Sequence, residues 1–178
     1  MRFDLSPTEI RVLCTLMEKA ETTPDQYPMS SGALTNACNQ KTSREPVTNF
    51  DEHDVDATVL ALRERQVVRS VKPSGSRGWK HRHCLDEVLP MTLPEQALIT
   101  VLGLRGAQSG GELKTRTARI HEFESNDEVE VVLRDLQARP VPVVANIGRE
   151  TGQSQDRWVL CFGSEAQTPA QGLSLIHI

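Results

Sequence analysis

The sequence lacks several features that would assign a protein to a class at once. No apolar run approaches the roughly 18 residues of a membrane-spanning helix, and Met1–Asp4 does not begin a signal peptide. The four cysteines stand singly, with no Cys-x-x-Cys pair. We therefore expect a cytoplasmic protein with reduced thiols and no contact with a membrane.

The sequence also has no excess of one charge. It carries 20 Lys and Arg residues against 24 Asp and Glu residues. A domain that grips nucleic acid by bulk charge is strongly basic, so this balance excludes that class. Any site for a polyanion must be local.

The chain does contain an internal repeat. Ser6–Glu9 opens an apolar-periodic run, and Thr92–Glu95 opens a similar run 86 positions later. Trp79 recurs as Trp158, at an offset of 79. Two copies of one unit that differ in their loops explain these offsets.

The first copy predicts three helices followed by a hairpin. Ser6 caps a helix that continues to about Ala20, with Ile10, Leu13, Cys14 and Met17 on one face. Further helices are expected over Ser31–Gln40 and Glu52–Arg65. The strands expected next are Val67–Val71 and Trp79–Leu85, joined by a Gly-rich turn. This order is the winged-helix plan, an elaborated helix-turn-helix.

The second copy predicts the same order. Its second helix begins at Gly110 with Leu113 and Ile120 as core residues, and its third covers Asn126–Ala138. Pro140 and Pro142 are expected to bracket the first strand, which the strand Arg157–Leu160 follows. The predicted fold class is α+β, with two tandem winged-helix domains at residues 1–90 and 91–163. Residues 164–178, including the apolar run Leu173–Ile178, fit neither copy and are interpreted as a disordered or non-native tail.

Several stretches resemble the YceH-like family of bacterial proteins over about Leu5 to Gly163. They are Thr22–Pro28, Ala37–Val47, Leu104–Gln108, Gly111–Leu113 and Arg149–Gln153. The resemblance implies a tandem winged-helix fold in the bacterial cytoplasm and implies no particular activity. Members often carry a C-terminal heptad segment, in whose place this chain has Leu173–Ile178.

The strongest local signal lies in the first hairpin. Between Gln66 and Leu85 the chain has five basic residues and no acidic one. Such a hairpin can lay cationic groups along phosphates, with its tip in a minor groove. With the turn after the second helix, it forms the predicted nucleic-acid site: Lys41, Arg44, Arg69, Lys72, Arg77, Trp79, Lys80 and Arg82. Two other interpretations stay open, a hairpin kept soluble by its charge and a long loop in which Asn39, Gln40 and Arg44 satisfy buried backbone.

The third helices favour a different partner. Base reading needs Arg, Lys, Asn or Gln on the exposed face, and the first copy has small, apolar and acidic residues there. Exposed apolar groups suit a partner protein, and the residues concerned are Ala57, Leu60, Ala61 and Val131. The main hypothesis is a regulatory protein that binds DNA, and the alternative is a protein-interaction module.

Catalysis finds little support in the sequence. His81 and His83 share one face of a strand while Cys84 points to the other, and no second pair completes a tetrahedral metal site. The Ser74–Gly78 turn lacks the Lys and following helix of a phosphate-binding loop. We therefore expect no enzyme activity, metal, cofactor or small-molecule substrate. We also expect Trp158 to be buried and Trp79 to be exposed.

Overall fold

The computed structural model describes residues 2–163 and begins with a helix whose start is fixed locally. Helix α1 (Pro7–Thr22) is capped by Ser6, whose Oγ accepts a hydrogen bond from the Glu9 backbone N–H at 3.1 Å. The Glu9 carboxylate accepts one from the Ser6 N–H at 2.7 Å, which completes a capping box. Residues 10–18 are buried without interruption, so α1 is a central helix rather than one with a single apolar face.

The first half continues with two helices and a hairpin. Helix α2 (Ser31–Cys38) and helix α3 (Glu52–Glu64) follow α1, with the short 3-10 helix η1 (Pro24–Gln26) before α2. Strands β1 (Val68–Val71) and β2 (Lys80–His83) form an antiparallel pair. The other edge of β2 pairs with Met29, which exchanges both backbone hydrogen bonds with His81. The hairpin is thereby joined to the segment that leads into α2.

The second half repeats this order with one added strand. After the 3-10 helix η2 (Leu85–Glu87) come helix α4 (Leu93–Arg105), strand β3 (Gln108–Ser109), helix α5 (Gly110–Arg116) and helix α6 (Asn126–Gln137). Strands β4 (Val144–Gly148) and β5 (Arg157–Leu160) follow, and the sheet order is β3-β5-β4. Residues 2–163 thus form a mixed α+β fold of six α-helices and two small antiparallel sheets.

Two expectations for the second half were wrong. The first strand begins at Val144, after Pro142, so Pro140 and Pro142 lie in the preceding turn rather than at the two ends of the strand. Ile120 lies beyond the end of α5 and is only half-buried, whereas Leu113 is fully buried as expected. Both errors come from placing chain reversals by composition alone. The predicted tail, residues 164–178, lies outside the described residues.

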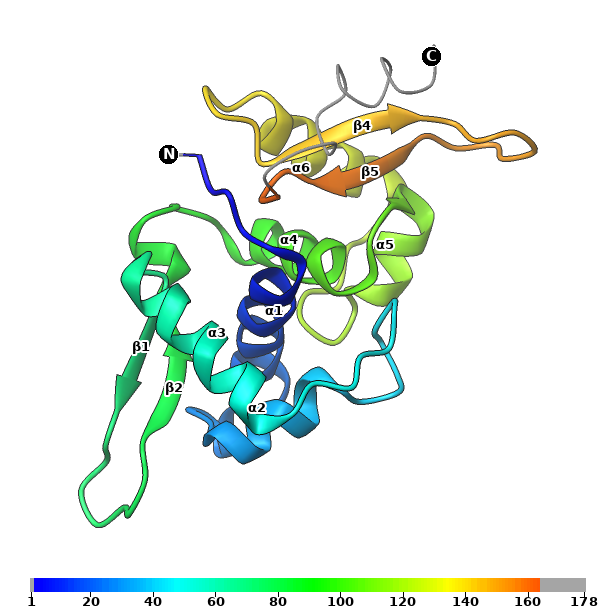
Figure 1. The fold of residues 1–178 in the computed structure, drawn as a ribbon. Coiled ribbons are helices and arrows are strands. Elements are labelled where there is room, and N and C mark those ends of the chain that lie inside the picture. Colours follow the sequence, from blue (N-terminus) through cyan, green and yellow to red (C-terminus); the bar gives the residue numbers. More distant parts are fainter. Residues whose placement is uncertain (1, 164–178) are drawn as a thin grey trace.

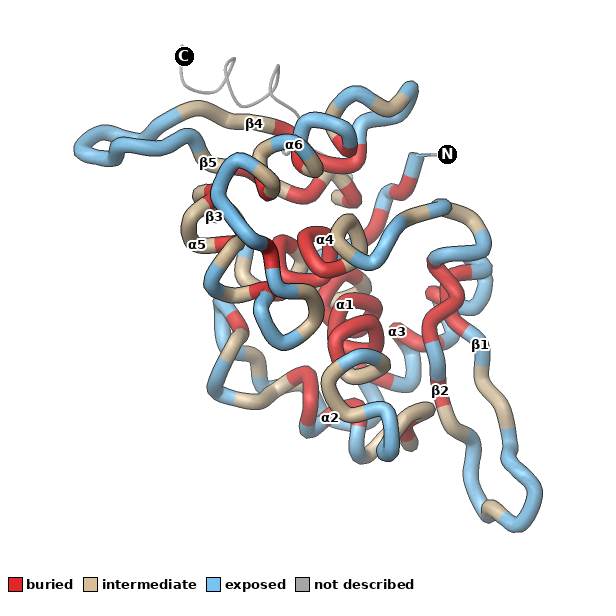
Figure 2. The backbone as a smooth tube through the Cα atoms, turned by 180° about the vertical axis from the view of Figure 1, so that it is seen from behind, coloured by how far each residue is buried: buried red, intermediate tan, exposed pale blue. Residues whose placement is uncertain are grey.

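One hydrophobic core runs through both halves. Buried residues of α1 and α4 belong to the same cluster, and both helices carry the buried colour in Figure 2. Helix α4 crosses α1 at Gly103. A Cβ at Gly103 would overlap Cys14 Sγ and lie 3.2 Å from Cys14 Cβ and 3.3 Å from Ile10 Cγ2. Only glycine allows the two helices to approach this closely. The two hairpins extend from this core in different directions (Figure 1).

Candidate functional site

The first hairpin has two chemically different faces. In the β1–β2 register, Arg69 lies opposite Arg82 and Ser70 lies opposite His81. Opposed residues of an antiparallel pair share a face, and successive residues alternate between faces. The exposed Arg69 and Arg82 and the half-buried Lys80 therefore share the outer face, while the buried His81 lies on the inner face.

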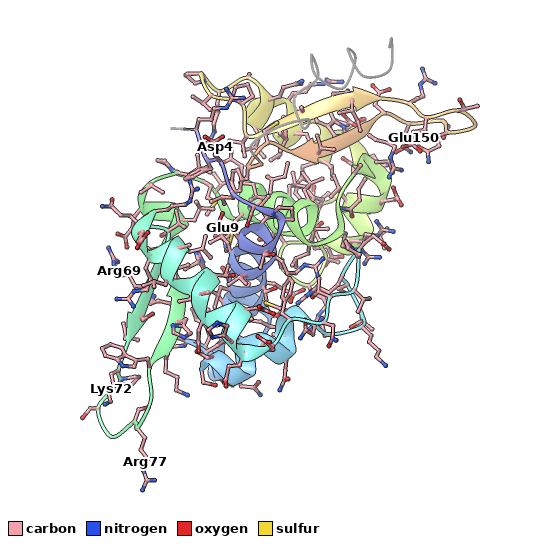
Figure 3. All side chains as sticks on the ribbon, in the orientation of Figure 1. Asp4, Glu9, Arg69, Lys72, Arg77 and Glu150 are labelled. Atoms are coloured by element: carbon pink, nitrogen blue, oxygen red, sulfur yellow. The ribbon has the colours of Figure 1, made fainter. Side chains whose placement is uncertain are left out.

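The outer face and the tip hold the cations of the predicted nucleic-acid site. Lys72 and Arg77 are exposed at the tip and point away from the rest of the protein (Figure 3). Arg69 forms a two-pronged ion pair with Glu87 of η2, which neutralises its charge. The hairpin cations without such a pair in the described chain are Lys72, Arg77, Lys80 and Arg82.

Arg44 does not lie on the surface that the sequence predicted for it. It is 4% exposed, and its Nη2 lies 2.7 Å from Glu18 Oε1. The same Nη2 donates a hydrogen bond of 2.9 Å to the Ala37 carbonyl, near the C-terminal end of α2. Arg44 therefore satisfies buried backbone, and its guanidinium is closed to an external phosphate.

Lys41 is exposed but lies far from the hairpin. The loop 39–51, which carries Lys41, and the β1–β2 hairpin occupy opposite sides of the molecule in Figures 1 and 2. The structure thus does not join the turn after α2 and the hairpin into one positive surface.

The two tryptophans differ as expected. Trp79 is 58% exposed, whereas Trp158 is 1% exposed. Trp158 lies within β5, which pairs with β3 and β4 on its two sides. Trp79 precedes β2 in the chain and lies outside any described strand. The repeat therefore keeps the tryptophan position and changes its environment.

Trp79 lines a groove of about 700 Å³ between α3 and the first hairpin. One wall is a stripe along α3, a second is formed by Ser70, Trp79 and His81 of the hairpin, and the N-terminal turn of α2 closes one end. Leu60 of α3 is 55% exposed and lines the same groove. An apolar helix face and an apolar hairpin residue thus border one concave surface.

Acidic, apolar and basic residues follow one another along the α3 wall. Its lining residues are Glu52, Asp56, Val59, Leu60 and Arg63, which fall within about 100° around the helix axis. The stripe is acidic at the start of α3, apolar in the middle and basic at the end. Residues spaced at i, i+4, i+8 and i+11 share one side of a helix. This spacing is the sequence signal that could have predicted the stripe.

A hydrogen-bond relay holds the walls of the groove together. Ser31 Oγ lies 2.5 Å from Asp56 Oδ1 and 2.9 Å from His81 Nε2, and Ser70 Oγ lies 2.8 Å from His81 Nδ1. A carboxylate only accepts, so Ser31 donates to Asp56 and accepts from His81 Nε2–H. Burial lowers the pKa of His81 and so favours the neutral ring, whose Nδ1 then accepts a hydrogen bond from Ser70 Oγ. The relay links α2, α3 and both strands, so the groove is preformed.

The predicted interaction residues are only partly brought together. Leu60 borders the groove, and Ala57 is exposed and Ala61 half-buried on the same helix. Val131 is 54% exposed but lies on α6 in the other half of the chain. Arg134 occupies the repeat position of Leu60, so the apolar groove is a feature of the first half.

The fold and this surface define a mixed α+β protein of two similar halves, whose first half carries an exposed groove beside a projecting cationic hairpin. The chain belongs to the family described as "Protein of unknown function, DUF480", whose model matches residues 5–153. A UPF0502 protein of Marinomonas sp. (strain MWYL1) is 45% identical, covering 93% of this chain and 78% of the relative. A UPF0502 protein of Enterobacter sp. (strain 638) is 43% identical, covering 94% of this chain and 80% of the relative. A UPF0502 protein of Geotalea daltonii is 42% identical, covering 96% of this chain and 78% of the relative. The predicted resemblance to a bacterial family is confirmed.

Within residues 2–163, no helix combines the length and the apolar character needed to span a bilayer. In the same part of the chain, no three His, Cys, Asp or Glu side chains gather where they could hold a metal ion.

Proposed function

We propose that the protein is a non-enzymatic interaction module of the cytoplasm, made of two winged-helix units, that holds a segment of a partner protein in the α3–hairpin groove. One observation carries the proposal. Leu60 and Trp79 are the two most exposed large apolar residues of the described chain, and both line this groove. Concave sites bordered by exposed apolar anchors are typical of recognition surfaces.

The order of elements supports the winged-helix assignment. Three helices followed by a hairpin occur as α1, α2, α3 and β1–β2, and again as α4, α5, α6 and β4–β5. In a winged helix the third helix and the hairpin lie beside each other. The groove lies between those two elements of the first half.

The state of the thiols supports a role other than catalysis. Burial raises the pKa of the Cys14 thiol to about 12 and that of the Cys161 thiol to about 11. Nucleophilic catalysis by cysteine requires the thiolate, so these groups are protonated and unreactive near neutral pH.

A single substitution tests the docking proposal. Leu60→Glu places a charge in the groove at an exposed position, so the free energy of unfolding should change by no more than about 0.5 kcal/mol. Burying a leucine contributes about 1.5–3 kcal/mol, so binding should be lost. The matched control is Val131→Glu, an equally exposed apolar residue outside the groove.

The measurement is affinity purification of the full chain from bacterial cells, followed by mass spectrometry. Proteins recovered with the wild type and with Val131→Glu should be missing with Leu60→Glu. Recovery of the same proteins with all three variants would contradict docking in the groove. Loss of stability in Leu60→Glu would show that Leu60 is part of the core.

The projecting hairpin favours a second candidate function, binding of nucleic acid through the outer face and tip. With Lys72, Arg77, Lys80 and Arg82 as phosphate contacts, the log–log salt slope of DNA binding should be about −3.6. The Arg77→Ala, Lys80→Ala double variant should flatten it by about 1.8 units. Lys41→Ala, on the other side of the molecule, should leave the slope unchanged. An unaltered slope in the double variant would remove the hairpin from nucleic-acid binding.

A further inference from the structure

We infer that the groove accepts a short basic–apolar segment of the partner protein, with its Lys or Arg residues against Glu52 and Asp56 and its apolar side chain between Leu60 and Trp79. This inference rests on the docking function proposed above and adds the chemistry of the occupant. It follows from which polar groups of the groove are already satisfied and which are open.

The relay residues are satisfied internally. Ser31, Ser70 and His81 use their side-chain groups on one another and on Asp56. These residues therefore shape the wall and offer little hydrogen-bonding capacity to an occupant.

The open groups are charged and lie at the two ends of the α3 stripe. Within residues 2–163, the side chains of Glu52 and Arg63 make no hydrogen bond or ion pair, and Asp56 uses only Oδ1. Glu52 leans over the first turn of α2, since a Cβ at Gly32 would come within 3.3 Å of its Oε1. The stripe therefore has two carboxylates at its first end and one guanidinium at its other end.

The spacing of these charges limits the size of the occupant. Eleven residues separate Glu52 from Arg63, which corresponds to about 16 Å along a helix at 1.5 Å per residue. An extended peptide covers that distance with about five residues, at roughly 3.3 Å each. The complementary segment is thus short, with basic residues at one end and an apolar anchor in the middle.

The charge of the groove also selects against nucleic acid. Phosphates would meet Glu52 and Asp56, whereas the cations of the hairpin strands face the opposite side. Trp79 on the inner face is then an anchor for an apolar side chain. Tryptophan is enriched in such central positions of interfaces.

Selection from a phage-displayed library of random twelve-residue peptides tests this inference. The full-length wild type is the target, and the Leu60→Glu variant removes peptides that bind elsewhere. Groove-dependent peptides should be enriched in an apolar residue next to two or more Lys or Arg residues. A synthetic copy of one selected peptide then serves as the probe, with Trp79 fluorescence and anisotropy as readouts.

The variants predict graded losses of affinity for that peptide. Glu52→Gln and Asp56→Asn should each weaken it by about two- to fivefold, as expected for an exposed ion pair. Trp79→Ala should weaken it by at least about thirtyfold, the size of an interface hot spot. Glu64→Gln is the matched control, because Glu64 lies on α3 outside the groove lining and should have no effect.

The outcomes distinguish a failure of this inference from a failure of the docking function on which it rests. Groove-dependent peptides that are neutral or acidic, or insensitive to Glu52→Gln, would overturn the charge assignment and leave the docking function intact. If no groove-dependent peptide is enriched and Leu60→Glu retains every partner, both this inference and the docking function are wrong. Binding of a single-stranded oligonucleotide that Leu60→Glu abolishes would make the groove a nucleic-acid site. Loss of a dimer in Leu60→Glu would make the occupant a second copy of the chain.

Discussion

Replacing Arg44 by alanine tests the ion pair that fixes the loop between α2 and α3. Arg44 Nη1 and Nη2 lie 3.1 and 2.7 Å from the two oxygens of Glu18, and their side chains are 0% and 10% exposed. Removing one partner of a buried pair costs about 3–5 kcal/mol, because the other charge stays buried. Lys19 Nζ, 3.5 Å from Glu18 Oε1, partly compensates. We therefore expect a loss of about 3 kcal/mol, at the lower end of that range.

Urea unfolding followed by circular dichroism measures this loss. At a slope of about 2 kcal/mol per molar urea, Arg44→Ala should lower the midpoint by about 1.5 M. Lys41→Ala, in the same loop but exposed, should shift the free energy of unfolding by no more than about 0.5 kcal/mol. A loss below about 1 kcal/mol for Arg44→Ala would refute the burial of the pair, and would return Arg44 to the surface as a possible phosphate contact.

Two further predictions concern the helix crossing and pH. Gly103→Ala should destabilise the protein by about 1–2 kcal/mol, because overpacking against Cys14 outweighs the helical preference of alanine. Adding Cys14→Ala should restore part of the loss, and a Gly103→Ala protein as stable as the wild type would contradict the close approach. Burial lowers the pKa of His81 and of His83, so the unfolded chain takes up protons first. Stability should be complete above about pH 7 and fall as the pH drops below about 6.5. Urea midpoints at about pH 7.5 and about pH 5.5 should differ less in a His81→Gln, His83→Gln variant, and a wild type more stable at the lower pH would contradict buried neutral rings.

Features determined by neighbouring residues were predictable from the sequence. The capping boxes at Ser6 and Thr92 place the starts of α1 and α4 as expected. Strand β5 covers Arg157–Leu160, as predicted. The shared face of His81 and His83 follows from strand alternation, and both side chains are buried. The caps and the alternation along the strands depend on residues a few positions apart, which local patterns record, whereas the pairing of β5 with β3 joins residues 50 positions apart, Gln108 and Trp158.

Features that depend on distant residues were not predictable in the same way. Arg44 pairs with Glu18, 26 positions away, and no periodic pattern relates the two. The periodic apolar face of α1 did not reveal that α4 would cover its other flank. Strand β3 has two residues, too few for a pattern, and it exists because β5 offers a free edge.

The groove is an intermediate case. Its α3 wall follows from helical periodicity, yet the face expected to be exposed was centred on Ala57 and Leu60 and did not include Arg63. Trp79 was expected to be exposed, and it is. Its side of the hairpin depends on register, which is fixed by the pairing of Ser70 with His81. Proximity of Trp79 to Leu60 thus required the tertiary structure.

The close crossing of α1 and α4 also bears on how the chain is synthesised. The flank of α1 near Ile10 and Cys14 stays uncovered until α4 has been made. Ribosomes add about 5–20 residues per second, and only 15 residues separate Pro90 from the end of α4 at Arg105. Once the first half is complete at Pro90, the apolar flank therefore stays open to water for only about a further 1–3 s. The covering helix α4 comes first in the second half. The apolar flank of α1 is therefore covered before the rest of that half is made, which shortens the time in which a nascent chain can aggregate through this flank.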